Sequence, residues 1–277
     1  MLFFSKRSLC SLLLLFGLFG AAQANESYSF GVVPQGTATK LAMKWIPVLD
    51  WLSNKSGVEL RFETAPDIPT FEQRVSAGEY DFAYMNPYHF VVYNESPGYH
   101  ALAHANGTRI KGIVVVPKSS SVQTLADLQN KTLAYPSPAA FAATLVVRSA
   151  LRQKGIQADA DFVKSHDSVY INVAKGLYPA GGGIERTLAL TNPEIRKQLR
   201  VLWVSPGYTP HAIASRPGMS ESARTRIKEA MAAMNDDPKG REILKGIGFK
   251  GFESAADKDW DDIRSLKIDA KESGINR

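Results

Sequence analysis

The sequence has almost no cysteine. Its 277 residues contain a single cysteine, Cys10, which lies near the N-terminus. A disulfide needs two cysteines, so the chain is not a small secreted domain held together by disulfides. A cysteine nucleophile, a G-x-S-x-G serine motif and His/Glu spacing typical of zinc sites are also lacking. We therefore expect no enzyme activity, no metal and no cofactor.

A strong excess of charge of one sign is lacking as well. The chain has 33 basic and 27 acidic residues, a net charge of +6. Without Lys6 and Arg7, 31 basic and 27 acidic residues remain, and the net charge is +4. This surplus is too small to indicate a nucleic-acid partner, and it is compatible with an anionic small ligand. The 44% of hydrophobic residues suffices for a large core in one or two domains.

The first 24 residues have the pattern of a signal peptide. Lys6 and Arg7 precede the apolar run Leu9–Phe19, and the small residues of Ala22-Gln23-Ala24 follow. The apolar run is too short to span a membrane. We expect cleavage after Ala24 and export to the periplasm.

The rest of the chain alternates between short apolar strands and amphipathic helices. This order predicts an α/β fold with mostly parallel sheets covered on both faces, and such sheets bind ligands at the carboxyl ends of their strands. Several polar turns lie at strand-to-helix junctions. The first is Pro34-Gln35-Gly36-Thr37, where Thr37 or Thr39 can cap the helix that follows.

The segment 131–155 is the most informative of these junctions. A strand at 132–135, which ends at Tyr135, leads through Pro136-Ser137-Pro138 into an alanine-rich helix. Ser137 can be the N-cap and Pro138 the first helical residue, so the backbone N–H groups of Ala139 and Ala140 could bind an anion. The alternative is an ordinary strand–helix joint without a ligand.

Two further junctions carry polar side chains. The strand 82–84 leads to Asn86 as N-cap and Pro87 as first helical residue, with Tyr84 and Tyr88 beside them. Tyrosine and asparagine can bind an oxyanion without burial of a net charge, but these tyrosines could equally be core residues. The strand near 161–164 leads to Ser165 and His166 at a helix start, where His166 could bind an anion or be a surface or core histidine.

Three consecutive glycines follow at Gly181-Gly182-Gly183. They permit close approach of the backbone to a ligand, or form a flexible turn. They do not have the spacing of a P-loop, which disfavours nucleotide binding.

Three segments together resemble a known family. They are FGVVPQGTATKLAMKW (30–45), APDIPTFEQRVSAGEYDFAYMNPYHFVVY (65–93) and KSHDSVYINVAKG (164–176). They resemble the phosphate, phosphite and phosphonate solute-binding proteins of ABC importers, and the resemblance extends from Tyr28 to about Ile263. It implies a type II periplasmic-binding-protein fold: two α/β lobes with a ligand cleft and two hinge crossings. We place the crossings at 113–116 and 211–215, which gives 25–112 plus 217–277 as lobe one and 113–216 as lobe two.

The resemblance also implies a site. In this family the ligand's oxyanion lies on a helix start of the second lobe, commonly at a Ser-Thr-Ser-type run, with a histidine and a tyrosine nearby. His166 matches that histidine, and the turn 84–88 matches the tyrosine-bearing turn. The helix start at 137–140 offers only one hydroxyl, and no acidic residue lies near Pro179, where the family can place one. The predicted ligand contacts are Gln35, Tyr84, Asn86, Tyr88, Tyr135, Ser137, Ala139, Ala140, Ser165 and His166.

The predicted function is therefore that of a periplasmic solute-binding protein of an ABC importer, a monomer that binds a small oxyanion and presents it to a membrane permease. One alternative is a ligand-sensing module that signals to a membrane sensor kinase. Another is an enzyme, because the same lobed fold occurs in a pyrimidine-forming enzyme of thiamine synthesis.

Overall fold

The computed structural model describes residues 27–268 and 273–275. The predicted signal peptide and its cleavage site after Ala24 lie outside the described residues. Within the described ranges, no helix combines the length and the apolar character that a bilayer crossing requires.

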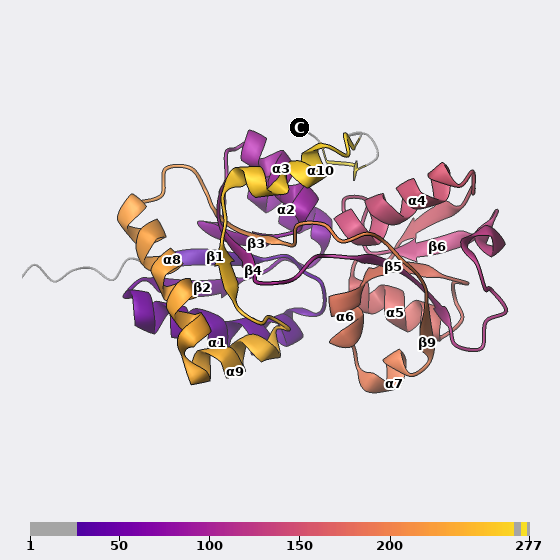
Figure 1. Cartoon of the computed structure of the whole chain (residues 1–277), viewed down its shortest axis with the longest axis horizontal. Helices are drawn as coiled ribbons and strands as arrows, with labels where there is room; N and C mark the ends of the chain where they lie inside the picture. The colour runs from indigo at the N-terminus through magenta and orange to yellow at the C-terminus, as the bar shows by residue number, and fades with distance from the viewer. Residues whose placement is uncertain (1–26, 269–272, 276–277) are drawn as a thin grey trace, which may run out of the picture.

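The described residues form two lobes, each built on its own sheet (Figure 1). The sheet of lobe one has the strand order β11-β4-β10-β3-β1-β2, and the sheet of lobe two has the order β7-β6-β8-β5-β9. The strands are β1 (Ser27–Val32), β2 (Glu59–Glu63), β3 (Phe82–Met85), β4 (His100–Ala105), β5 (Gly112–Pro117), β6 (Thr132–Tyr135), β7 (Asp159–Phe162), β8 (Gly181–Ile184), β9 (Leu199–Val204), β10 (Ala212–Ser215) and β11 (Phe252–Ser254). This α/β architecture in two lobes agrees with the predicted fold class.

The sheets are mixed rather than mostly parallel. β1 runs parallel to β2 and β3, whereas β10 pairs antiparallel with β3 and β4. In lobe two, β6 runs parallel to β7 and β8, whereas β5 is antiparallel to β8 and β9. The expectation of mostly parallel sheets was therefore wrong, because the chain crosses between the lobes and returns in the opposite direction.

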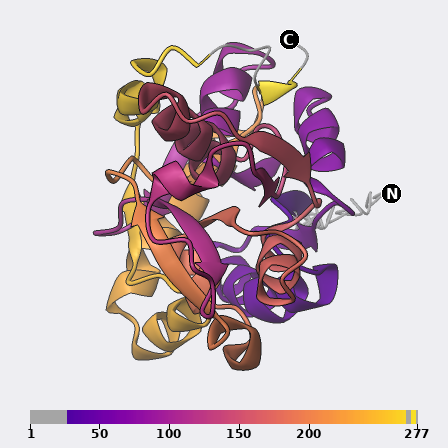
Figure 2. The same cartoon turned by 90° about the vertical axis from the view of Figure 1, so that its right-hand side faces the viewer.

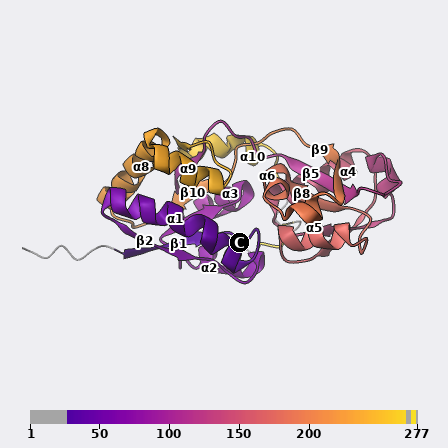
Figure 3. The ribbon, with the colours of Figure 1, turned by 90° about the horizontal axis from the view of Figure 1, so that it is seen from below.

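Helices cover both sheets (Figures 1 and 3). Lobe one carries α1 (Ala38–Ser56), α2 (Ile68–Ser76), α3 (Pro87–Glu95), α8 (Glu221–Asp236), α9 (Pro238–Gly246), η3 (Asp257–Trp260) and α10 (Asp261–Arg264). Lobe two carries η1 (Leu125–Leu128), the π-helical segment η2 (Phe141–Val146), α4 (Val147–Gln153), α5 (His166–Ala174), α6 (Glu185–Ala189) and α7 (Pro193–Arg196).

The helices of lobe one begin and end at local signals. The Thr37 side chain accepts a hydrogen bond from the Lys40 amide at the start of α1, and Gly57 ends the helix in the left-handed conformation. α2 begins after Asp67, whose carboxylate accepts a hydrogen bond from the Thr70 amide at 3.0 Å and so caps the helix.

The two lobes are joined by two chain crossings, residues 106–111 and 205–211. Ile110 and Tyr208 exchange two backbone hydrogen bonds of 2.8 and 2.9 Å, so the crossings are paired at their centre. The strand β10, at 212–215, belongs to the sheet of lobe one. The assignment of these residues to lobe two was therefore wrong, and the second crossing lies earlier in the chain.

The three glycines form the buried strand β8, not a flexible turn. A Cβ on Gly182 would lie 2.0 Å from the Ala143 carbonyl oxygen, and one on Gly112 would lie 2.2 Å from the Ala142 carbonyl oxygen. Only glycine fits at such distances, so these two positions let the start of η2 lie with its backbone directly on the sheet.

The lobes pack against each other in this structure. Phe141 and Leu145 of η2, together with Ile184 at the end of β8, belong to the same buried hydrophobic cluster as the core of lobe one. The view along the long axis shows the elements of lobe two in front of those of lobe one (Figure 2). This contact brings the strand-to-helix turns of both lobes together.

Candidate ligand-binding site between the lobes

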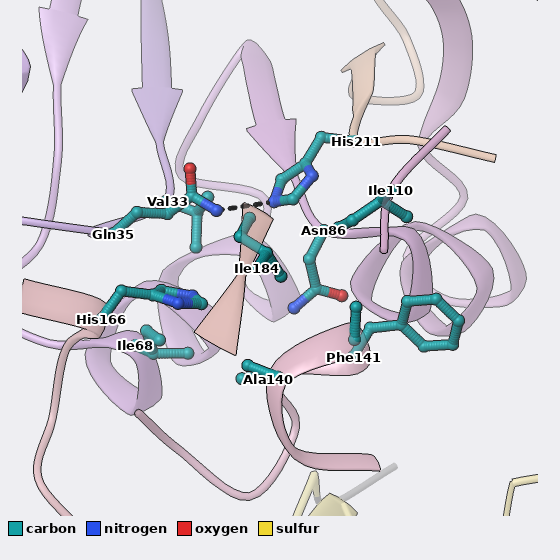
Figure 4. Close-up of a pocket in the computed structure, with 12 residues that line it drawn as sticks. Val33, Gln35, Ile68, Asn86, Ile110, Ala140, Phe141, His166, Ile184 and His211 are labelled. Carbon is teal, nitrogen blue, oxygen red and sulfur yellow. Dashed lines mark hydrogen bonds between the residues drawn. The ribbon is translucent and has the colours of Figure 1, made fainter. Parts of the chain in front are cut away.

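A small cavity lies where the two lobes meet (Figure 4). Its volume is about 10 Å³, which is room for about one water molecule. Residues from both lobes line it: Val33, Gln35, Ile68, Asn86, Ile110 and His211 on one side and Ala140, Phe141, Ala142, Ala143, His166 and Ile184 on the other. None of these residues is acidic.

The helix on the lobe-two side begins three residues later than predicted. Ala140 is the N-cap and Phe141 the first helical residue, so neither Ser137 nor Pro138 has its predicted role. The Ala140 amide donates to the Ser137 carbonyl at 3.3 Å and is already used within the turn. The first-turn N–H groups of a helix have no partner within the helix. The backbone donors at the cavity are therefore those of residues 141–143.

The Ser137 side chain has an unusual environment. It is buried, and its hydroxyl has no hydrogen-bond partner among the described residues. Its carbonyl accepts from the Thr144 hydroxyl at 2.7 Å, which holds the turn against the helix. A buried hydroxyl without a partner is rare in proteins and is often satisfied by a bound molecule.

Asn86 links the two lobes. Its side-chain oxygen accepts from the His89 amide at 2.9 Å, which confirms its predicted role as the N-cap of α3. Its side-chain NH₂ group donates across the cleft to the Ala139 carbonyl at 3.0 Å. Tyr88, two residues further on, is buried and its hydroxyl has no partner within the described part of the chain.

A hydrogen-bond network connects Arg186 of lobe two to Gln35, Tyr84 and His211 on the lobe-one side of the cavity. Arg186 of lobe two donates to the Gln35 side-chain oxygen at 2.7 Å and to the Tyr84 hydroxyl at 2.8 Å. With its oxygen so occupied, Gln35 presents its NH₂ group to Nε2 of His211 at 2.9 Å (Figure 4). That nitrogen must accept, so the His211 imidazole is neutral with its proton on Nδ1. Burial, and secondarily the charge of Arg186, lower the pKa of His211 well below its usual value.

Tyr84 holds two members of this hydrogen-bond network, His211 and Arg186, in position. Its ring stacks on the His211 ring with centroids 5.0 Å apart and contacts Trp45 at 4.7 Å. Burial raises the pKa of its hydroxyl, which stays protonated beside Arg186. Tyr84 therefore positions His211 and Arg186 rather than lining the cavity.

His166 is the second neutral imidazole of the site. It is buried at the start of α5, and burial, followed by the charge of Arg186, lowers its pKa to about 3. Its Nδ1 lies 3.5 Å from the Thr187 hydroxyl. The preceding residue, Ser165, uses its hydroxyl to accept from the Ser168 amide at 3.1 Å and so caps the helix.

The structure thus places the predicted residues in different positions. Gln35, Asn86, Ala140 and His166 line the cavity. Tyr84, Tyr88, Ser137 and Ala139 are buried but do not line it, and Ser165 caps α5. The Tyr135 ring packs over Gly182 and near Phe162 in the core of lobe two. Within the described residues, no group of three or more His, Cys, Asp or Glu side chains could hold a metal ion.

Sequence reasoning missed His211, Arg186 and the amides of residues 141–143. His211 precedes β10, whose antiparallel direction brings its first residue to the edge where β1 and β3 end. A sheet expected to be mostly parallel gives no reason to look there. Arg186 directly follows the glycine strand, and that position was the available signal.

Comparison with known proteins identifies the family of the chain. Residues 30–260 match the family described as ABC transporter, phosphonate, periplasmic substrate-binding protein. The chain is 23% identical to the phosphonates-binding periplasmic protein of Escherichia coli (strain K12), in an alignment that covers 92% of this chain and 80% of that protein.

Two solved structures are similar in fold. One is a binding-protein component of an ABC phosphonate transporter from Pseudomonas aeruginosa, with a TM-score of 0.80 and 17% identity over 90% of this chain and 92% of that one. The other is a protein of Prochlorococcus marinus (MIT 9301) in complex with methylphosphonate, with a TM-score of 0.80 and 18% identity over 91% of this chain and 100% of that one.

Proposed function

This chain belongs to the family of phosphonate periplasmic substrate-binding proteins of ABC transporters, and we propose that it binds a small phosphorus oxyanion between its lobes and delivers it to a membrane permease. It acts in the periplasm as a monomer, and it carries its ligand without converting it. The similar protein from Prochlorococcus marinus holds methylphosphonate, which supports a ligand of this class.

The observation that carries the proposal is the set of donors at the cavity. The first-turn amides of residues 141–143, the side chains of Gln35 and Asn86, and two neutral histidines converge there, and no carboxylate lines the space. Helix starts favour anions because their free N–H groups and the helix dipole both point toward the ligand. Neutral donors can hold an oxyanion without a competing buried charge.

The cavity, at about 10 Å³, is smaller than a phosphonate, so the lobes must separate to admit one. We propose that they do so about the paired crossings at 106–111 and 205–211, as in other two-lobed binding proteins. The hydrogen bond from Asn86 to the Ala139 carbonyl then opens. On closure, the Ser137 hydroxyl, which has no partner among the described residues, gains one in the bound anion.

Calorimetry on the purified protein tests this proposal. Phosphate, phosphite and methylphosphonate are titrated separately, and we expect binding of at least one of them. The variant Ser137→Ala should bind that anion about tenfold or more weakly, because one hydrogen bond to a charged group is lost. Its thermal stability should not fall, since the hydroxyl has no partner in the free protein.

The matched control is Thr144→Val. This hydroxyl donates to the Ser137 carbonyl and has no proposed contact with the anion, so its loss should lower stability more than affinity. Absence of binding to all three anions would contradict the proposed function. Equal affinity of wild type and Ser137→Ala would remove Ser137 from the site.

A further inference from the structure

A second pocket lies next to the cavity, toward the outer side of the cleft. Its volume is about 50 Å³, and both lobes contribute to it. Gln35 lines the pocket and the cavity alike, so its side chain is the partition between the two spaces. The remaining lining comprises Gly36, Lys40, Leu41, Lys44, Trp45, Asp167, Arg186, Thr187, Leu190 and Ile247. We call this space the outer pocket.

The outer pocket carries more positive than negative charge. Lys40, Lys44 and Arg186 line it together with one carboxylate, that of Asp167. Asp167 is already paired: its carboxylate lies 2.7 Å from the Lys40 ammonium, across the two lobes. The positive charges of Lys44 and Arg186 are therefore not balanced by a carboxylate in the lining of the outer pocket.

Neither of these two has a counter-ion within the described part of the chain. The recorded contacts of Arg186 are to neutral oxygens, namely the Gln35 side chain, the Tyr84 hydroxyl and the Ile247 carbonyl. Lys44 is partly buried, and the one carboxylate that lines the outer pocket, that of Asp167, forms its ion pair with Lys40 instead. Burial and, secondarily, the charges of Arg186 and Lys40 lower the pKa of Lys44, and the nearby charge of Asp167 opposes this shift without cancelling it.

The walls around these charges are apolar. Leu41, Trp45 and Ile247 form much of the lining, so water is partly excluded and an ion pair formed there is screened less than one on the open surface. A pocket with apolar walls and a few convergent charged groups is a typical binding site for a small charged ligand group.

We propose that the ligand carries a second acidic group, a carboxylate or a second phosphoryl group, and that Lys44 and Arg186 bind this group in the outer pocket while the first phosphonate occupies the cavity. This inference rests on the proposed function and specifies its ligand class. It excludes aminoalkylphosphonates as preferred ligands, because their ammonium group would face two cations.

Calorimetry with three probes tests this inference. Methylphosphonate carries no second charged group, phosphonoacetate adds a carboxylate, and 2-aminoethylphosphonate adds an ammonium. We expect phosphonoacetate to bind about tenfold to a hundredfold more tightly than methylphosphonate, which is the range that one charge-assisted contact supplies. 2-Aminoethylphosphonate should bind most weakly of the three.

The variant Lys44→Met tests whether the preference for phosphonoacetate depends on the outer pocket. It should reduce the preference for phosphonoacetate about tenfold and leave the affinity for methylphosphonate unchanged. The control Lys55→Met removes the same charge from the same helix, α1, at an exposed position about 16 Å further along the axis. It should change neither affinity.

The outcomes separate the two proposals. If none of the three probes binds, this inference fails, and the titrations of phosphate and phosphite decide whether the proposed function fails with it. If methylphosphonate binds but phosphonoacetate binds no more tightly, or if Lys44→Met keeps the preference, only the second acidic group is contradicted.

Discussion

The two lobes contribute different kinds of polar groups to the cleft. Lobe one contributes side chains: Gln35, Asn86 and His211 line the cavity, and Tyr84 holds His211 in position. Lobe two contributes mainly backbone, because the start of η2 lies directly on two glycine-bearing strands. His166 and Arg186 are its polar side chains near the cleft.

This difference determines how each half can be altered. A donor on a side chain can be removed by substitution at its own position, with little change elsewhere. A backbone donor depends on the position of the whole helix start, which is fixed by glycines far away in the sequence. We therefore expect substitutions in lobe two to act through the fold, and those in lobe one to act through single contacts.

The largest effect is expected for Gly182→Ala. The new Cβ would lie 2.0 Å from the Ala143 carbonyl oxygen, so the start of η2 must move off the sheet. Overpacking typically costs about 1–3 kcal/mol, and we expect the upper end of this range here because the clash is with a backbone atom. Chemical denaturation should show a lower free energy of unfolding, and calorimetry should show loss of anion binding.

Gly246→Ala is the matched control for that experiment. Gly246 is an exposed residue at the end of α9 with no atom within 4 Å of an added Cβ, so stability should stay the same or rise slightly. A Gly182→Ala protein as stable as wild type would show that lobe two does not hold the helix start by this contact.

A smaller loss is expected for Asn86→Ala. The change removes the cap of α3 and leaves the Ala139 carbonyl buried without its donor. The cap contributes about 1 kcal/mol and the buried carbonyl about 1–2 kcal/mol more, so the free energy of unfolding should fall by about 2–3 kcal/mol. Ser165→Ala removes a helix cap and a hydrogen bond to the Ser168 hydroxyl, both within lobe two, and should cost about 1 kcal/mol. Equal losses for the two variants would contradict a stabilising bond between the lobes.

The smallest expected effect concerns pH. Burial lowers the pKa of His166 from 6.5 to about 3, so between these values the unfolded chain binds a proton that the folded protein does not. Proton binding to the unfolded chain favours unfolding, so this contribution destabilises the protein as pH falls below about 6.5. At pH 5 it amounts to about 2 kcal/mol relative to pH 7.

The variant His166→Asn should therefore lose less stability than wild type between pH 7 and pH 5. The double variant with His211→Asn should lose less still, since burial and Arg186 also depress the pKa of His211. Denaturation curves at several pH values measure these slopes. Identical slopes in wild type and both variants would contradict the neutral state of the two histidines.

The sequence predicted the features that depend on neighbouring residues. The cap at Asn86, Thr37 as one of two candidate caps, and the two-lobed α/β fold follow from local patterns and from the family resemblance. The start of η2 could not be predicted in this way. Ser137 and Pro138 have the pattern of a helix start, but contact with strands β5 and β8 places the first helical residue at Phe141.

The site residues, too, could be predicted only where local sequence patterns position them. Asn86 and His166 lie at helix starts and were found by their position, whereas His211 reaches the cavity only because β10 returns antiparallel from the second crossing. Arg186 contacts Gln35 and Tyr84, which are 151 and 102 residues away in the chain. Contacts at such separations leave no periodic pattern in the sequence.

The pairing of Ile110 with Tyr208 has a mechanical consequence. Because the two linkers share a pair of hydrogen bonds at mid-length, they bend as one ribbon and resist sliding past each other. The proposed separation of the lobes would then take place by rotation at the residues on either side of this pair, along a single arc. The two halves of the cleft would return to the same relative position each time the lobes close.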